Sequence, residues 1–474
     1  MKLVSQRKNL DSLTILLLML VPNLLWLCVV YPGYLQADHQ ISIASFALGH
    51  PREWHSLLWC LFAFPFLYWS PSIAVYGVVQ IVAYVALMMF SIKRLQRIDI
   101  IKRRGGFILA TVYGFFPTFV AYNQLYSSDV MFAYILVPIT VMLMEVYKTS
   151  GECLKSIKFS AFFCLFMYLA CELRKNAILI PVIAACVLLL IYKPVRKRLA
   201  ALFAVLLASL LATSVFFSVV LQSEASPSQE MLSVPAMQIA RVYVDDGDIP
   251  DSVRKDLEQV RSADDWKSNY VDYLADYEKK GLTLSATFIK DWLILGLRNP
   301  SSYIQAYQDL MYPYWQLTVG DDRVSIDFQN HDDFTIGTCG NQCRAEYVSQ
   351  FKRNKQPSSA RLLEMIRIAN EEHYPFVNDF YNLIICNRAL PLWVIIFGFV
   401  VAGIRGRLKA FIVVAIPLFS VVLSLICFSP IAFMRYSMQA YYMIPVMILF
   451  LVYLFRKESK EDGKPLPVQV QLYR

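Results

Sequence analysis

The stretch LTILLLMLVPNLLWLCVVY, residues 13–31, decides the class of fold. It carries no charge and is long enough for a helix to cross roughly 30 Å of hydrocarbon. Lys2, Arg7 and Lys8 precede it and no small-residue cleavage site follows it, so we predict an uncleaved anchor. The chain has 474 residues, is 57% hydrophobic and has a mean hydropathy of +0.46. These values are typical of an integral membrane protein and exclude an ordinary soluble domain.

Further apolar stretches predict an all-α polytopic membrane protein with about ten transmembrane helices. They cover residues 73–92, 107–122, 130–147, 159–171, 177–192, 199–221, 389–404, 410–428 and 431–455. Residues 54–69 are also apolar, but this segment is short, contains Pro65 and has a tryptophan at each end. We therefore predict an interfacial or re-entrant helix there.

The positions of lysine and arginine predict the topology. If residues 54–69 do not span, the basic clusters all fall on one side, which the positive-inside rule makes cytoplasmic. The clusters are Lys2, Arg7 and Lys8; Lys93, Arg94, Arg97, Lys102, Arg103 and Arg104; Lys148, Lys155 and Lys158; Lys193, Arg196, Lys197 and Arg198; Arg405, Arg407 and Lys409; and Arg456, Lys457 and Lys460. Both termini are then cytoplasmic in a plasma or inner membrane. The net charge of +9 is explained by anchoring and gives no support to nucleic-acid binding.

Composition divides the chain into four parts: an N-terminal transmembrane module, 1–221, with a first outer loop, 32–72; an extracytoplasmic domain, 222–388; C-terminal transmembrane helices, 389–457; and a cytoplasmic tail, 458–474. The extracytoplasmic domain reads as mainly helical, because apolar residues recur at spacings of three and four in 230–243 and 284–297. Asn299 and Pro300 predict the cap and first turn of a helix that runs to about residue 315.

Residues 316–355 of this domain lack periodicity and predict a loop. Cys339 and Cys343 could form a local disulfide if this side of the membrane is oxidising. A zinc site would need four ligands, and only His331 lies nearby.

Polar residues collect at the predicted outer ends of the spans. Asp38 follows the first span and Asp129 opens the fourth. Arg174, Lys175 and Arg435 lie at the same boundary and depart from the positive-inside rule. Arginine there can bind an anionic head group through charge-assisted hydrogen bonds, or it can pair with Asp38 and Asp129 and hold helices together. Both alternatives stay open at this stage.

In their order along the chain, these residues resemble the GT-C type glycosyltransferases, multi-pass enzymes that use polyprenyl-phosphate-linked sugars. The resemblance is carried by YPG at 31–33 with Asp38, by Trp54-His55, by Ser128-Asp129 and by LRKN at 173–176. Later pieces, at 232–241, 288–292, 299–306 and 434–436, are similar to one bacterial and largely uncharacterised branch of that class.

The resemblance implies transfer of a hexosyl or related group from polyprenyl phosphate to an acceptor hydroxyl of a cell-surface glycan or glycolipid, in polysaccharide biosynthesis at the cell envelope. Phosphate is already a good leaving group, so the chemistry requires a base and positive charge. We predict Asp38 as the base. Asp129 is the second catalytic candidate, which would orient the acceptor, bind a cation with Asp38 or pair with Arg174. The predicted phosphate ligands are Arg174, Lys175 and Arg435, and the predicted substrate contacts are His39, Trp54, His55, Asn176 and Tyr436.

The lipid-linked sugar donor is the only ligand that this prediction requires. His39 stands where relatives carry a second acidic residue, which puts a metal-dependent mechanism in doubt but leaves a divalent cation open. The expected partners are membrane lipid, the donor and a glycan acceptor, with the oligomeric state open. Two other functions are kept: a polysaccharide polymerase or ligase that uses diphosphate-linked oligosaccharides, and a lipid or solute transporter. A transporter is disfavoured because the charges gather at one face and not near the midplane.

Overall fold

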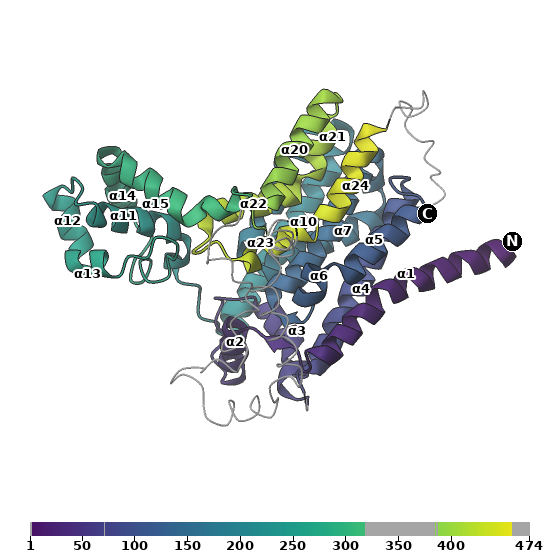
Figure 1. Cartoon of the computed structure of the whole chain (residues 1–474), viewed down its shortest axis with the longest axis horizontal. Helices are drawn as coiled ribbons and strands as arrows, with labels where there is room; N and C mark the ends of the chain where they lie inside the picture. Colours follow the sequence, from purple (N-terminus) through teal and green to yellow (C-terminus); the bar gives the residue numbers. More distant parts are fainter. Residues whose placement is uncertain (1, 71, 318–383, 385–386, 457–474) are drawn as a thin grey trace, which may run out of the picture.

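The computed structural model describes residues 2–70, 72–317, 384 and 387–456. This part of the chain is almost entirely helical (Figure 1), as predicted. Its exception, which the all-α prediction did not include, is a parallel pair of two-residue strands, β1 (Tyr34–Leu35) and β2 (Leu125–Tyr126).

The helices form a bundle with a smaller unit at its side (Figure 1). The bundle and its loops contain α1 (Lys2–Val29), α2 (Ala37–Ala47), α3 (Leu57–Tyr68), α4 (Ala74–Arg97), α5 (Arg103–Phe115), α6 (Pro117–Tyr122), α7 (Ser128–Lys148), η1 (Glu152–Lys155), α8 (Ile157–Leu173), η2 (Lys175–Ile178), α9 (Leu179–Ile191), η3 (Lys193–Val195), α10 (Arg196–Val215), the π-helix η4 (Phe216–Val220), α20 (Leu390–Ile404), α21 (Leu408–Val414), α22 (Ile416–Phe428), α23 (Met434–Tyr441) and α24 (Ile444–Phe455).

The smaller unit is inserted between α10 and α20, and its described part is called the inserted domain, residues 222–317. It contains η5 (Ser228–Met231), α11 (Ser233–Val244), α12 (Asp251–Glu258), α13 (Ala263–Ser268), α14 (Ala286–Arg298), α15 (Pro300–Met311) and η6 (Tyr312–Tyr314).

Among the described residues, four helices are long and apolar enough to cross a membrane: Asn9–Val29, α4, α7 and Lys193–Val220. Two bent pairs, α21 with α22 at 64° and α23 with α24 at 42°, raise the number to six if each pair counts as one span. The segments α3, Lys175–Ile191 and α20 are apolar but shorter. The finer prediction of about ten spans therefore stays a prediction.

Prolines explain where three of the predicted spans are interrupted. The stretch 107–122 divides into α5 and α6 at Pro117, while Pro417 stands in the first turn of α22 and Pro445 in that of α24. Proline has no backbone N–H and fits the first turn of a helix, so each of these residues starts a new segment.

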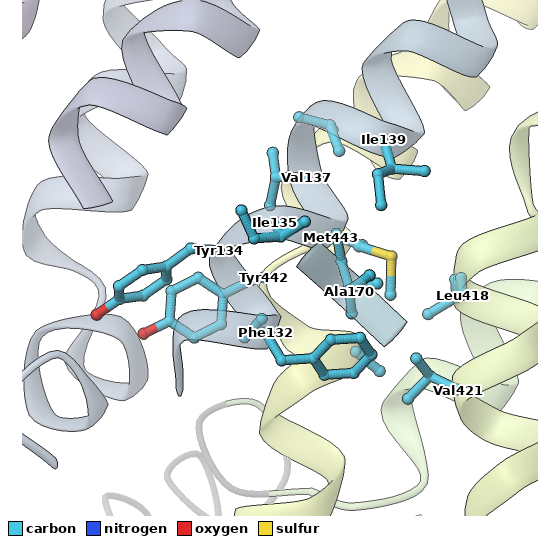
Figure 2. Close-up of a cluster of buried hydrophobic side chains, with 14 of the residues drawn as sticks. Phe132, Tyr134, Ile135, Val137, Ile139, Ala170, Leu418, Val421, Tyr442 and Met443 are labelled. Carbon is cyan, nitrogen blue, oxygen red and sulfur yellow. The ribbon is translucent and has the colours of Figure 1, made fainter. Parts of the chain in front are cut away.

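Helix α7 is the centre of the bundle, because its sequence is apolar on all sides and nearly all its residues are buried. Figure 2 shows Phe132, Ile135 and Ile139 of this helix among side chains of the C-terminal helices. The hydroxyls of Tyr134 and Tyr442 both donate to Oδ1 of Asn123, each at 2.7 Å. This packing fixes the start of α7, where Asp129 lies.

Arg94 belongs to one of the predicted cytoplasmic basic clusters, but its side chain is buried inside the bundle and paired with a carboxylate. It is 7% exposed and forms an ion pair with Glu145 of α7, which is fully buried. Its guanidinium carbon also lies 5.0 Å from the ring centre of Phe90 and 4.8 Å from that of Phe159. A helical spacing cannot reveal this partner, because the two charged residues lie on different helices.

Replacing Glu145 with alanine is expected to lower the free energy of unfolding by about 3–5 kcal/mol, because the Arg94 charge is left buried without its carboxylate. Denaturant unfolding of the full chain in detergent micelles measures the change. Glu152→Ala is the matched control: its ion pair with Lys155 is half exposed and should contribute less than about 1 kcal/mol. Equal losses in the two variants would contradict a special role for the buried pair.

The inserted domain has its own core, which includes Ile239, Trp266 and Leu295. Its helices α11 and α14 coincide with the two predicted periodic stretches. The helix predicted from Pro300 to about residue 315 is α15, which ends at Met311 and is followed by a turn containing Pro313. Asn299 occupies the cap position, but its side chain bonds to the backbone of Asp248 instead of capping the helix.

Several predicted features lie outside the described residues. They are most of the predicted loop 316–355, with His331, Cys339 and Cys343, and the predicted cytoplasmic tail 458–474.

Candidate functional site

Strands β1 and β2 bring the loop after α1 beside the loop before α7. Tyr34 pairs with Leu125 and Leu35 with Tyr126, and the Tyr126 hydroxyl donates to the Pro32 carbonyl at 2.8 Å. A Cβ at Gly33 would lie 2.0 Å from the Tyr126 hydroxyl oxygen, and one at Gly77 would lie 2.1 Å from it, so Tyr126 fits only against glycine at both positions. This pairing places Asp38 and Asp129 at the same end of the bundle.

A cavity of about 810 Å³ lies between this end of the bundle and the inserted domain. On one side are five of the predicted site residues together with Gln36. We call this side the bundle wall: Gln36, Asp38, Trp54, His55, Arg435 and Tyr436. Residues of both the bundle and the inserted domain thus line one cavity.

Two ion pairs join the predicted catalytic carboxylates to the predicted phosphate ligands. Oδ2 of Asp38 lies 3.3 Å from Nη1 of Arg435, and Asp129 pairs with Arg174. The ring of Tyr436 contacts both cations, because its centre lies 4.8 Å from the Arg435 guanidinium carbon and 5.4 Å from that of Arg174. Pairing of the arginines with carboxylates, one of the two alternatives from the sequence, is thus observed.

Asp38 is held as a carboxylate. Burial raises the pKa of its carboxyl group, but the Arg435 guanidinium lowers it by more, together with an amide hydrogen bond from Gln36 at 3.0 Å. The net pKa lies below the usual 3.8. While Arg435 stays paired with it, Asp38 is a weak base.

His39 lies beneath the cavity and does not line it. It is 1% exposed, and its Nε2 accepts the backbone N–H of Ser128 at 2.9 Å, which leaves the proton on Nδ1. Burial, with His55 next, lowers its pKa to about 3, so the ring is neutral at neutral pH. The geometry shows His39 joining α2 to the start of α7.

His55 lies between His39 and the cavity. Its ring centre is 4.7 Å from that of His39 and 4.6 Å from that of Trp54. Burial lowers its pKa more than Asp38 and Asp129 raise it, so His55 is also neutral. A neutral imidazole and an indole beside one carboxylate suit hydroxyl groups better than further anions.

Besides His39, four predicted site residues do not line the cavity: Asp129, Arg174, Lys175 and Asn176. Lys175 is half exposed and its Nζ lies 3.3 Å from Oε2 of Glu53. Asn176 lines, with Arg174 and Gln439, a separate space of only about 10 Å³. Arg174 contacts the cavity lining through the ring of Tyr436.

The side of the cavity opposite the bundle wall could not be predicted from the sequence. We call it the inserted-domain wall: Gln229, Glu230, Asp276 and Lys279. Lys279 is 6% exposed, and its Nζ lies 2.7 Å from Glu230 and 2.9 Å from Asp276. Gln229 and Glu230 stand at the start of one periodic stretch, and Asp276 and Lys279 lie in a charged segment before the next, so apolar spacing holds no signal that these polar side chains face the bundle.

No group of three or more His, Cys, Asp or Glu side chains that could hold a metal ion occurs in the residues that the structure describes. Asp38 and Asp129 each face an arginine instead.

Glu278, next to Lys279, predicts a pH-dependent stability. It is 1% exposed, and burial raises its pKa to about 7, more than the amides of Glu278 and Val271 and the Arg261 guanidinium lower it. Its pKa in the unfolded chain is close to 4.5. Both states are protonated below that pH; between 4.5 and about 7 the unfolded chain loses its proton first, so stability falls as the pH rises.

Glu278→Gln should therefore raise the free energy of unfolding at pH 8, by up to about 3 kcal/mol at 1.36 kcal/mol per pKa unit, and should change it little at pH 4.5. Urea unfolding of the full chain at both pH values, followed by tryptophan fluorescence, checks this. Glu258→Gln, at an exposed ion pair, should show no such dependence. A gain of the same size at both pH values would contradict the titration of Glu278.

Comparison with known proteins gives one family match. No curated protein and no solved structure matches the chain. The family model that matches is DUF6020, described as a family of unknown function, and it covers residues 69–464. That range includes Asp129, Arg174 and Arg435 and the whole inserted domain, whereas Asp38 precedes it. Because the match extends over most of its length, the chain belongs to the DUF6020 family.

Proposed function

We propose that this protein is a GT-C type glycosyltransferase that moves a sugar from polyprenyl phosphate to an acceptor hydroxyl of a cell-surface glycan or glycolipid on the extracytoplasmic face. The observation that carries the proposal is the Asp38–Arg435 pair on the wall of the 810 Å³ cavity. It places a candidate base and a candidate phosphate ligand 3.3 Å apart. The side chains of both residues are partly exposed, 29% and 16%, so a ligand can reach them.

The pair suggests how the donor activates the base. The donor phosphate takes the place of the Asp38 carboxylate on Arg435, since a guanidinium can form two parallel hydrogen bonds to phosphate. Asp38 then loses its cation and gains an anionic neighbour, and both changes raise its pKa. The released carboxylate accepts the proton of the acceptor hydroxyl.

The transfer step is balanced by these two residues. The acceptor oxygen forms a bond to the anomeric carbon, and the bond between that carbon and the phosphate oxygen breaks. The proton goes to Asp38, and the phosphate leaves with the electron pair beside Arg435, whose charge stabilises it. The Tyr436 hydroxyl accepts a hydrogen bond from Nη2 of Arg435 at 2.8 Å and so holds the guanidinium in place.

The apolar helices support a lipid-linked donor. Arg435 stands in the first turn of α23, which continues through a bend into the apolar α24. A phosphate at Arg435 would thus have apolar helices on one side, for the polyprenyl chain, and the cavity on the other, for the sugar. A bundle of about ten spans with its basic loops in the cytoplasm is part of this proposal.

Mass spectrometry of surface glycans and lipid-linked sugars tests the proposed function. Cells without the protein should lose one sugar substituent and accumulate a polyprenyl-phosphate sugar. Accumulation of a diphosphate-linked oligosaccharide would favour the polymerase or ligase instead. Unaltered glycans and lipids would reject the transferase and favour the transporter.

The proposed topology has its own test. Reporter fusions after Lys102, between α4 and α5, and after Ser262, before α13, are expected to report opposite compartments, with Lys102 cytoplasmic. A fusion after Arg407, between α20 and α21, is the control and should agree with Lys102. The same compartment for Lys102 and Ser262 would remove the basis for an extracytoplasmic site.

A further inference from the structure

The inserted-domain wall is built independently of the bundle wall. Ser228 Oγ accepts the Leu284 N–H at 3.3 Å, and Gln229 Oε1 accepts the Gly281 N–H at 3.1 Å. These two bonds join the segment before α11 to the turn that carries Asp276 and Lys279. The wall is therefore a fixed surface made of two chain segments.

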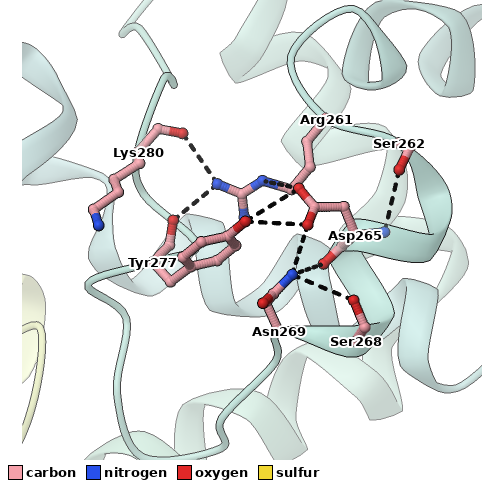
Figure 3. A network of polar contacts seen from close by, with 7 residues as sticks. All are labelled: Arg261, Ser262, Asp265, Ser268, Asn269, Tyr277 and Lys280. Atoms are coloured by element: carbon pink, nitrogen blue, oxygen red, sulfur yellow. Dashed lines mark hydrogen bonds and ion pairs between the residues drawn. The ribbon is translucent and has the colours of Figure 1, made fainter.

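Arg261 holds this turn from behind. Figure 3 shows its guanidinium between Asp265 and the turn, with Nη2 donating to the carbonyls of Tyr277 at 2.8 Å and Lys280 at 3.2 Å. Arg261 is 8% exposed, and its guanidinium carbon lies 4.4 Å from the ring centre of Tyr277. The backbone around Lys279 is thus fixed before any ligand contacts it.

The turn is also attached to the loop that leads to Arg435. The Ala275 N–H donates to the Pro430 carbonyl at 2.9 Å, and the Tyr314 and Ser429 hydroxyls lie 2.8 Å apart. A molecule that reaches from Asp38 across the cavity therefore meets the inserted-domain wall in a defined position.

The charges on the two sides distinguish their ligands. Beside the two carboxylates of the inserted-domain wall, Glu230 and Asp276, the cavity is lined by two ammonium groups, that of Lys279 and that of the adjacent Lys280. Lys279 lies between the two carboxylates. Such an array offers hydrogen-bond donors and acceptors without net charge, which suits vicinal hydroxyl groups and gives no advantage to an anion. The side chains of Glu230 and Asp276 are 30% and 56% exposed, so they have room for further bonds.

A second observation comes from Gln36 on the bundle wall. Gln36 is 8% exposed, and within the described residues its Oε1 accepts no hydrogen bond although its Nε2 donates to Asp38. A buried acceptor oxygen beside the base is a site for a hydroxyl donor, because leaving it without a partner costs about 1–3 kcal/mol. Both walls thus offer polar groups that can bind hydroxyl groups, one at each end of the cavity.

We propose that Gln229, Glu230, Asp276 and Lys279 form a binding site for an uncharged sugar residue of the acceptor. That the bound sugar belongs to the acceptor rests on the proposed function. One hydroxyl of the bound glycan lies at Gln36 and Asp38, and a neighbouring sugar residue lies on the inserted-domain wall. An aromatic surface for the glycan between them is supplied by Trp54.

Saturation-transfer NMR on the full chain in lipid nanodiscs tests this site without needing catalysis. The probes are a panel of neutral hexose trisaccharides and the same trisaccharides with a terminal uronic acid. The wild type should bind at least one neutral trisaccharide, and more tightly than its charged analogue. Asp276→Asn, which keeps the Lys279–Glu230 pair, and Lys279→Met should each weaken binding by about tenfold or more.

Lys267→Met is the matched control, since Lys267 pairs with Asp246 on the same domain and does not line the cavity. It should bind as the wild type does. If Lys279→Met does not fold, Asp276→Asn decides alone, because its side chain is half exposed. No binding of any neutral trisaccharide to the wild type, or equal binding by wild type and Asp276→Asn, would overturn the proposal.

A measurement of donor binding distinguishes failure of the sugar site from failure of the proposed function. Binding of a polyprenyl-phosphate hexose is measured on the same nanodiscs and should be unchanged in Asp276→Asn. Sugar binding that depends on the wall, without any donor binding, would support the sugar site and reject the transferase. Donor binding, together with sugar binding that is unchanged in Asp276→Asn, would support the transferase and reject the sugar site.

Discussion

Replacing Asp38 with asparagine is expected to lower the transfer rate by about 10²–10⁴-fold, the usual contribution of a general base. The same change should strengthen donor binding, because Asp38 and the donor phosphate compete for Arg435. Asparagine has nearly the same shape, and its side-chain oxygen can still accept from Gln36. The combination of slower transfer and tighter donor binding is what distinguishes a base from a structural carboxylate.

The measurement uses the purified full chain with a polyprenyl-phosphate sugar and, as the acceptor source, membranes from cells that lack the protein. Single-turnover transfer gives the rate, and titration without membranes gives the donor affinity. Asp246→Asn, at an exposed ion pair of the inserted domain, controls for the loss of one negative charge. Retained transfer in Asp38→Asn would remove Asp38 from the mechanism.

Replacing Arg435 with lysine is expected to weaken donor binding by about 10- to 100-fold, the loss of one or two hydrogen bonds to a charged group. Lysine keeps the positive charge near Asp38, but an ammonium cannot reproduce the planar pair of donors that phosphate takes. The stability of the chain should change little, because the attraction between the two side chains is kept.

Arg241→Lys is the matched control for Arg435→Lys, since Arg241 also pairs with carboxylates, Asp245 and Asp309, but outside the cavity. Donor titration and thermal unfolding are measured on both variants. Unchanged donor affinity together with a lower unfolding temperature in Arg435→Lys would assign Arg435 to helix packing. That result would also reject the proposal that the donor phosphate displaces Asp38 from Arg435.

The sequence was sufficient for the class of fold and for one side of the cavity. Long apolar stretches predict helices whatever their partners are, and the ends of those stretches place Asp38 and Arg435 on one face. His55 was predicted only from the resemblance to GT-C glycosyltransferases. The pair between Asp129 and Arg174 was among the alternatives considered. Pro117, Pro417 and Pro445 were visible inside the predicted spans and would have indicated their interruptions.

The remaining features depend on contacts between distant segments, which periodicity does not encode. Apolar spacing shows which side of α11 or α14 is buried, but it cannot show that Lys279 faces Asp38 across a cavity. Likewise the sequence predicts His39 as a substrate contact beside Asp38, whereas the pairing of β1 and β2 lets it accept the Ser128 N–H beneath the cavity. Arg94 stands in a basic cluster of the sequence, and only the packing of α4 against α7 shows that it pairs with Glu145.

The ion pair between Asp38 and Arg435 joins a segment that is synthesised early to one that is synthesised late. The ribosome produces α2 early and α23 near the end, after the whole inserted domain. A nascent or truncated chain that lacks α23 therefore has the proposed base without its cation and without Arg435, the proposed phosphate ligand. The Asp38–Arg435 pair therefore forms only after the inserted domain has been made, and under the proposed function a partly made protein at the membrane would lack the centre that consumes the lipid-linked donor.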